Sequence, residues 1–142
     1  MPTTTILLPR QLVQQVFHQA QAAPETEICG LIGARDGVVR SCYPVANASG
    51  DPTQLFDMDA QTLINAMKEM RERGESLFAI YHSHPHAPPE PSARDREQIS
   101  YPDAYYLIVS LNIKGVLEMR AWKPNAGGLR EVPLKIIPDD AA

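Results

Sequence analysis

Several residue patterns that mark whole classes of protein are missing from this sequence of 142 residues. Its two cysteines, Cys29 and Cys42, are too few for a disulfide framework, and they match neither a zinc ribbon nor a redox Cys-x-x-Cys motif. We expect both thiols to be reduced core residues. A hairpin turning near residues 35–37 would also allow a cross-strand bridge, so this alternative stays open.

Long apolar runs and clusters of basic residues are absent as well. No run approaches the roughly 20 residues that cross a bilayer, and residues 1–10 lack the charged and apolar regions of a signal peptide. The formal net charge is -4 and the basic residues are scattered, so no stripe neutralises a phosphate backbone. The sequence therefore predicts a cytoplasmic protein that binds neither membranes nor nucleic acid.

The composition is that of an ordinary folded protein, with 44% apolar and 21% charged residues. This length suits a single domain covering residues 1–142, with a core at about 7–136 and a frayed tail at 138–142. No internal repeat is present.

Apolar periodicity and turn residues predict the order of the elements. Helices are expected at 9–22 and from Asp57 or Asp59 to 73, followed later by a short helix at 92–100 after a proline-rich loop. Strands are expected at 26–34, 38–45, 77–81, 104–111, 114–123 and 129–137, with late turns at Lys114-Gly115 and residues 125–128. This order predicts an α/β (α+β) fold with one mixed, mostly antiparallel sheet flanked by helices.

Two histidines separated by one residue follow the strand at 77–81. Strand side chains alternate between faces, so His82 and His84 point the same way if the backbone between them is extended. Such a pair suits zinc, which in catalytic sites takes three protein ligands and water. Asp95 is the best third candidate. The alternative for Asp95 is a helix capping box with Ser92, in which both side chains only satisfy backbone amides.

A hydrolytic zinc site also needs a group that moves protons. Glu27 is the candidate, because it begins an apolar strand, where an unpaired carboxylate is costly to bury. Glu25 is the rival position and is more simply a solvated acid in the loop after Pro24.

These residues together match a known pattern. The string Glu-Ile-Cys-Gly-Leu at 27–31, then His82-Ser83-His84-Pro85, seven residues, Ser92, two residues and Asp95 resemble the JAMM motif of MPN-domain metalloproteases. The resemblance extends over about residues 7–134, since Phe56-Asp57, the following helix and residues 105–111 are also similar to family counterparts.

The resemblance implies a fold, a site and a class of substrate. The implied fold is a single MPN-like domain with a cytidine-deaminase-like architecture. The implied site has zinc on His82, His84 and Asp95, Glu27 as general base and then acid, and Ser92 as the donor to the oxyanion. The implied activity is hydrolysis of a peptide or isopeptide bond after the C-terminal glycine of a ubiquitin-like (β-grasp) or sulfur-carrier protein. A homodimer is left open.

Other interpretations fit the sequence less well. A metal-free MPN scaffold that binds partner proteins is the main alternative, and the intact ligand positions argue against it. A cupin or an amidohydrolase barrel fits the length and the two helices poorly. Among the remaining candidates, His86 is expected in solvent rather than as a fourth ligand. His18, Trp122 and the pair Tyr105-Tyr106 are expected to be structural.

Overall fold

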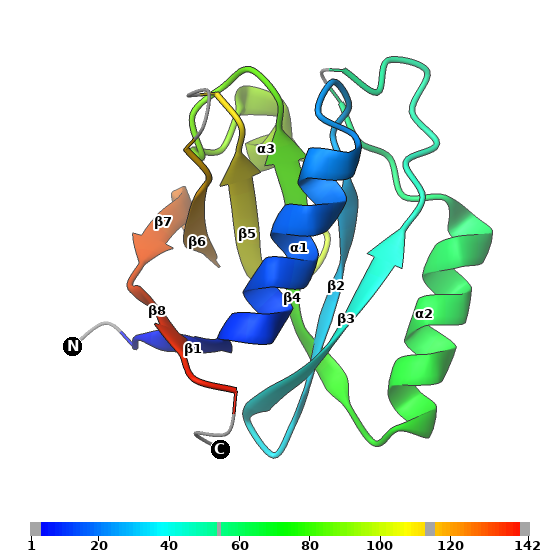
Figure 1. Ribbon diagram of the computed structural model, residues 1–142, viewed down its shortest axis with the longest axis vertical. Helices are drawn as coiled ribbons and strands as arrows, with labels where there is room; N and C mark the ends of the chain where they lie inside the picture. The colour runs from blue at the N-terminus through cyan, green and yellow to red at the C-terminus, as the bar shows by residue number, and fades with distance from the viewer. Residues whose placement is uncertain (1–3, 54, 113–115, 140–142) are drawn as a thin grey trace.

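A computed structural model describes residues 4–53, 55–112 and 116–139 (Figure 1). Six strands form one sheet in the order β3-β2-β4-β5-β6-β7, and only the β4–β5 pair is parallel. The expected mixed, mostly antiparallel sheet flanked by helices is therefore confirmed. Its members are β2 (Cys29–Arg35), β3 (Val38–Val45), β4 (Ser76–His84), β5 (Tyr105–Ser110), β6 (Glu118–Asn125) and β7 (Gly128–Val132).

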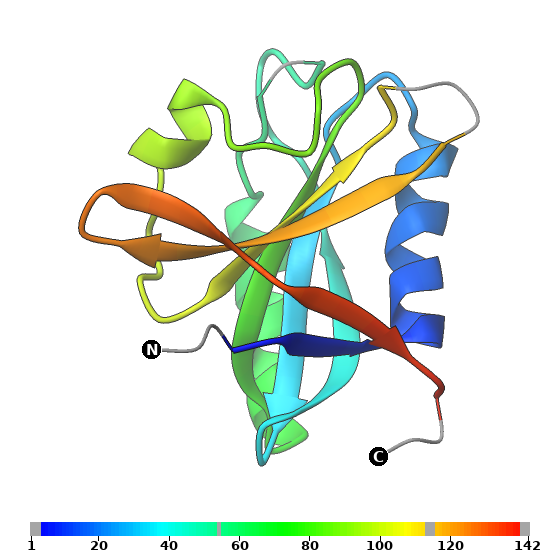
Figure 2. The same ribbon diagram turned by 90° about the vertical axis from the view of Figure 1, so that its left-hand side faces the viewer.

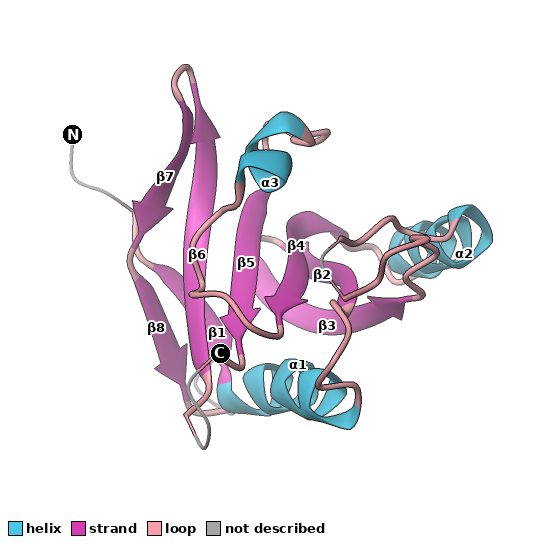
Figure 3. Cartoon of the chain, turned by 90° about the horizontal axis from the view of Figure 1, so that it is seen from above, coloured by secondary structure: helices cyan, strands magenta, loops and turns pink. Residues whose placement is uncertain are grey.

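Helices cover both faces of this sheet (Figure 3). Helix α1 (Arg10–Ala22) packs its apolar side on one face through Leu12, Val13 and Val16. Helix α2 (Ala60–Glu72) lies against the other face through Ala66 and Met70, and the short α3 (Ala93–Glu97) lies on that same side. The sheet therefore separates two apolar cores, and β4 contributes alternate side chains to each.

A second, two-stranded sheet was not predicted. Strand β1 (Ile6–Pro9) pairs in parallel with β8 (Leu134–Ile137), and Figure 2 shows both strands on the side of the molecule that faces the viewer, in front of the six-stranded sheet. The sequence interpretation missed β1 because four residues give little periodicity, and it merged β7 with β8. Pro133 separates these two strands, since proline donates no ladder hydrogen bond, and its carbonyl instead accepts from the Ile6 amide at 2.9 Å.

The other boundaries differ by a few residues. The helix expected at 92–100 is shorter, running from Ala93 to Glu97. Asp59 caps α2 as expected, its carboxylate accepting from the Thr62 amide at 2.9 Å. Strand β6 begins at Glu118 rather than 114, and the turn expected at Lys114-Gly115 lies outside the described residues. In the tail, Asp139 accepts a hydrogen bond from the Gln11 amide at 2.6 Å.

No helix among the described residues is long and apolar enough to span a bilayer.

Candidate metal centre

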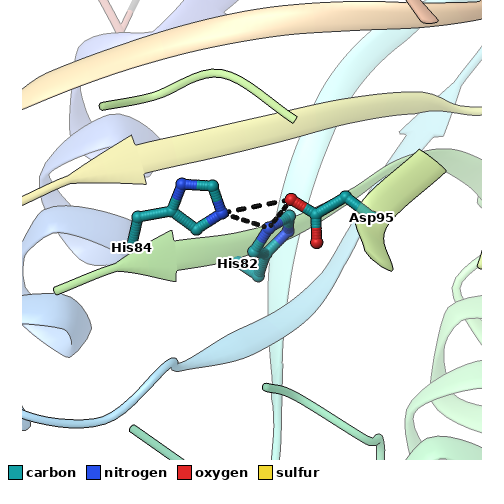
Figure 4. A group of neighbouring side chains, drawn as sticks. All are labelled: His82, His84 and Asp95. Atoms are coloured by element: carbon teal, nitrogen blue, oxygen red, sulfur yellow. Dashed lines mark hydrogen bonds and ion pairs between the residues drawn. The ribbon is translucent and has the colours of Figure 1, made fainter. Parts of the chain in front are cut away.

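Strand β4 continues past its expected end and carries both histidines. Residues 82–84 pair with β5 on one side, and His82 pairs with Cys29 of β2 on the other. The backbone is therefore extended, and the two imidazoles project to the same face, where both are buried. Figure 4 shows the rings converging on one carboxylate.

That carboxylate belongs to Asp95, in the first turn of α3. The Oδ2 atom of Asp95 lies 3.2 Å from Nε2 of His82 and 3.1 Å from Nε2 of His84. The capping box is present as well: Asp95 accepts from the Ser92 amide at 2.9 Å, and the Ser92 hydroxyl accepts from the Asp95 amide at 3.0 Å. The two readings of Asp95 are thus compatible, because the cap aims the carboxylate at the histidines.

The spacing of the three atoms fits a metal ion. The two Nε2 atoms lie 3.2 Å apart, so all three edges of the triangle measure 3.1–3.2 Å. Tetrahedral coordination at the usual bond lengths for zinc separates neighbouring ligand atoms by about 3.3–3.4 Å. Among the described residues this is the one group of histidine, cysteine and acidic side chains arranged to hold a metal.

The tautomer of His84 supports the same conclusion. Its Nδ1 atom lies 2.8 Å from the carbonyl oxygen of Pro88, which can only accept a hydrogen bond. In neutral His84 the proton is therefore on Nδ1, and the lone pair of Nε2 faces Asp95 and His82. Electron-rich atoms so close together repel one another unless a cation lies among them.

His82 is held differently. Its Nδ1 atom is buried without a hydrogen-bond partner among the described residues. The ring instead stacks on Phe56, with centroids 4.4 Å apart and planes 22° from parallel. Phe56 lies in the loop before α2. The ring of His82 is therefore held by stacking on this loop, whereas the ring of His84 is held by its hydrogen bond to Pro88.

Charge at the site follows from burial and these contacts. Burial opposes ionisation of Asp95, but its contacts with the imidazoles of His82 and His84 outweigh burial and hold the pKa of Asp95 well below its usual range. Burial lowers the pKa of His82 despite the neighbouring carboxylate. Burial opposes the charged form of His84, but its contacts with Asp95 and the Pro88 carbonyl, together with the charges of Asp95 and Glu27, outweigh burial and raise the pKa of His84.

Glu27 lies close enough to this group to interact with its charges. Its side chain is buried, with 6% of the residue exposed. Burial raises the pKa of Glu27 to about 8; the charge of His84 lowers it and that of Asp95 raises it. No side chain among the described residues donates a hydrogen bond to its carboxylate. Glu25 instead extends into solvent and contacts exposed His86 at 3.0 Å.

The proline-rich loop between β4 and α3 is tied down through its carbonyls. The Trp122 indole donates to the Pro89 carbonyl at 3.1 Å, and the Ser110 hydroxyl donates to the Ala87 carbonyl at 2.7 Å. Prolines lack amide donors, so such a loop is anchored by donors from outside. Sequence reasoning treated Trp122 as a plain sheet residue and did not single out Ser110, because both anchors are distant in sequence.

The structure explains why glycine occupies position 30 and why the two cysteines do not form a disulfide. A Cβ atom at Gly30 would overlap the ring of Tyr81, its cross-strand neighbour, so the motif needs glycine there. Both cysteines are free, as expected. Cys29 pairs with Val45 rather than Cys42, so the hairpin does not place the thiols opposite each other.

Comparisons with known proteins agree with this geometry. The model of the family described as prokaryotic homologues of the JAB domain matches residues 9–125. A desampylase from Haloferax volcanii is 34% identical over 64% of this chain and 67% of its own. A CysO-cysteine peptidase from Mycobacterium tuberculosis is 26% identical over 93% of this chain and 91% of its own.

The fold has a solved counterpart too. The solution structure of a protein from Desulfitobacterium hafniense superposes with a TM-score of 0.82 at 31% identity, covering 95% of this chain and 94% of that one. The resemblance seen in the motif is thus confirmed over most of the sequence. The chain belongs to the prokaryotic branch of the JAB family.

Proposed function

We propose that this protein is a zinc-dependent peptidase or isopeptidase that cleaves after the C-terminal glycine of a ubiquitin-like or sulfur-carrier protein. The observation that carries the proposal is the triangle of His82, His84 and Asp95 with Glu27 buried beside it. Relatives named desampylase, CysO-cysteine peptidase and probable TtuB-protein conjugate cleaving protease support the choice of substrate.

His82, His84 and Asp95 would hold the metal through Nε2, Nε2 and Oδ2. Zinc at this position would supply Lewis acidity, which polarises a carbonyl and makes water more acidic. Zinc is favoured over magnesium or calcium because two imidazoles and one carboxylate form a nitrogen-rich donor set, whereas those ions prefer oxygen ligands.

Glu27 would transfer the proton. A carboxyl group with a pKa near the working pH can take a proton from the attacking water and then give it to the leaving amine. Burial supplies the upward shift, and a cation nearby favours the carboxylate, which brings the pKa back toward neutrality. Since none of the described side chains donates to it, the carboxylate is available for both steps.

Ser92 would stabilise the oxyanion. Its oxygen already accepts a hydrogen bond from the Asp95 amide, but a hydroxyl also has a proton to donate. Ser92 is exposed, so a substrate can reach this proton. A donor fixed where negative charge develops stabilises the transition state more than the ground state.

The test uses the full chain loaded with zinc. The substrates are a β-grasp carrier joined through its C-terminal glycine to a lysine side chain, and the same carrier with a C-terminal cysteine adduct. Mass spectrometry should show carrier ending in glycine, with no product after chelation or in the His84→Ala variant. A protein that takes up no zinc and cleaves neither conjugate, yet binds the carrier, would favour the metal-free scaffold alternative.

A further inference from the structure

We propose that Ser83 and Asn47 are positioning residues that clamp the backbone on either side of the Glu27 side chain. The inference rests on the proposed role of Glu27 and extends it to residues outside the ligand set. Ser83 comes from β4, between the two histidines, and Asn47 comes from the loop after β3.

Ser83 connects the ligand strand to the segment that carries the base. Its side chain is fully buried and projects to the sheet face opposite His82 and His84. The Ser83 amide donates to the Ile28 carbonyl at 3.0 Å, and the Ser83 hydroxyl accepts from the Ile28 amide at 2.9 Å. In a regular antiparallel pair the second bond would go to a backbone carbonyl. The hydroxyl replaces it at the point where the chain leaves the ladder, just beyond Glu27.

Asn47 holds the other side of the same segment. Its side-chain NH₂ donates to the carbonyls of Glu27 at 2.9 Å and Leu55 at 3.0 Å. Its side-chain oxygen accepts from the amides of Ser49 at 2.9 Å and Asp57 at 3.0 Å. An asparagine side chain offers two donors and an acceptor with two lone pairs, so all of its capacity is used. Asn47 therefore joins the backbone of Glu27 to the backbone of Leu55 and Asp57, the two neighbours of Phe56.

The position of Glu27 is thus set through its backbone. Its amide donates to the Pro52 carbonyl at 2.7 Å, its carbonyl accepts from Asn47, and the next amide is held by Ser83. The carboxylate has no such restraint from the described residues. This division suits a base, because bonds to the carboxylate would compete with proton transfer, while a displacement of about 1 Å costs on the order of 10²-fold in rate.

A purely structural role for the two residues predicts different kinetics. If Ser83 acts through Glu27, its removal should matter only while Glu27 is present. If it only stabilises the fold, its removal should lower activity equally with or without the base. A double-mutant cycle separates the two cases.

The experiment compares four proteins: wild type, Ser83→Ala, Glu27→Gln and the double variant that carries both substitutions. We expect Ser83→Ala to lower kcat about 10²-fold, with KM and zinc content unchanged. In the Glu27→Gln background it should cause no further loss. Ser83→Thr keeps the hydroxyl and should restore kcat. Ser41→Ala, which removes a hydroxyl from β3 far from the histidines, should match wild type. Asn47→Ala should behave like Ser83→Ala.

Equal losses in both backgrounds, or an unchanged kcat in Ser83→Ala, overturn the inference. Amide hydrogen exchange supplies a test that needs no activity. The Ile28 amide should exchange faster in Ser83→Ala, while the Leu31 amide within β2 keeps its rate. An Ile28 amide that exchanges at the wild-type rate overturns the clamp. Inactive wild-type protein with this exchange pattern would refute the proposed function and leave the clamp standing.

Discussion

The imidazole of His84 donates through Nδ1 to the carbonyl oxygen of Pro88, 2.8 Å away, and this one bond decides which nitrogen faces Asp95. Metal-binding histidines generally use their second nitrogen in this way, which fixes the ring and its tautomer. The donor comes from the strand that carries His82, and the acceptor comes from the loop that delivers Asp95. This hydrogen bond therefore fixes the ring of His84 and also holds the loop that leads to Asp95.

Loss of a ligand should remove the metal. We expect zinc-loaded wild type to contain one zinc per chain, and His82→Ala, His84→Ala and Asp95→Ala to contain little, because two remaining donors do not make a closed site. Elemental analysis after dialysis measures this. Bound zinc should also raise Tm, by mass action on the folded state. Full zinc content in Asp95→Ala would show that the carboxylate is only a cap.

Glu27→Gln should separate chemistry from stability. With zinc bound, we expect metal content to stay and kcat to fall about 10²–10⁴-fold, the range for a lost general base. In the metal-free protein the pKa of Glu27 is about 8 folded against 4.5 unfolded.

The sign of the pH effect follows from that shift. Below about pH 4.5 the carboxyl is protonated in both states. Between pH 4.5 and 8 the unfolded state loses this proton while the folded state keeps it, so rising pH favours unfolding until the folded state also titrates near 8. Metal-free Glu27→Gln should therefore be more stable than wild type at pH 8 by about 1–3 kcal/mol, and the gap should close at pH 4. Chemical denaturation at both values measures it, and a constant gap contradicts the assignment.

Ser92 combines a cap with a proposed donor, and two variants separate them. Ser92→Ala should lower kcat about 10²-fold and destabilise α3 by about 1 kcal/mol. Ser92→Asp keeps a capping oxygen without a donor proton, so it should retain zinc and Tm but stay as slow as alanine. Ser92→Thr should keep both properties. Unimpaired kcat in Ser92→Asp would leave only the capping role.

Phe56 should affect the metal through His82. Replacing the ring by leucine keeps an apolar side chain but removes the flat support, and within the described part of the chain the Nδ1 atom of His82 has no hydrogen-bond partner to compensate. We expect Phe56→Leu to weaken zinc binding by about 10-fold, as other supports of ligands do. Competition with a chromogenic chelator measures it. Leu63→Ala, a change in the core beneath α2, is the control, and an equal effect there would point to general loosening.

Trp122→Phe tests the anchored loop. Phenylalanine keeps an aromatic ring but lacks the indole N–H that donates to the Pro89 carbonyl, and it fills less of the buried site. Together these losses should cost about 1–3 kcal/mol. We expect a fall in Tm and a several-fold loss of zinc affinity, because the loop carries the acceptor for His84. Unchanged zinc affinity would show that the loop keeps its course without this hydrogen bond.

The sequence predicted most of the sheet, both long helices and the convergence of His82, His84 and Asp95. Those predictions depend on alternation, periodicity and motif spacing, which are local properties. The β1–β8 pair was out of reach because it joins two four-residue segments from opposite ends of the chain. The supports of the site were missed for the same reason: the contacts of Phe56 with His82, Trp122 with Pro89 and Asn47 with Glu27 join residues distant in sequence. The resemblance included Phe56 but did not indicate what its ring contacts.

The parallel pairing of β1 with β8 ties both ends of the described chain to the flank opposite α3 (Figure 1). Anything attached there, such as an affinity tag or a fluorescent domain, would lie on the side of the molecule away from α3. The approach to the carboxyl end of β4 would stay open to a bulky conjugate. Labelled forms at either terminus should therefore be suitable for following cleavage of whole protein substrates.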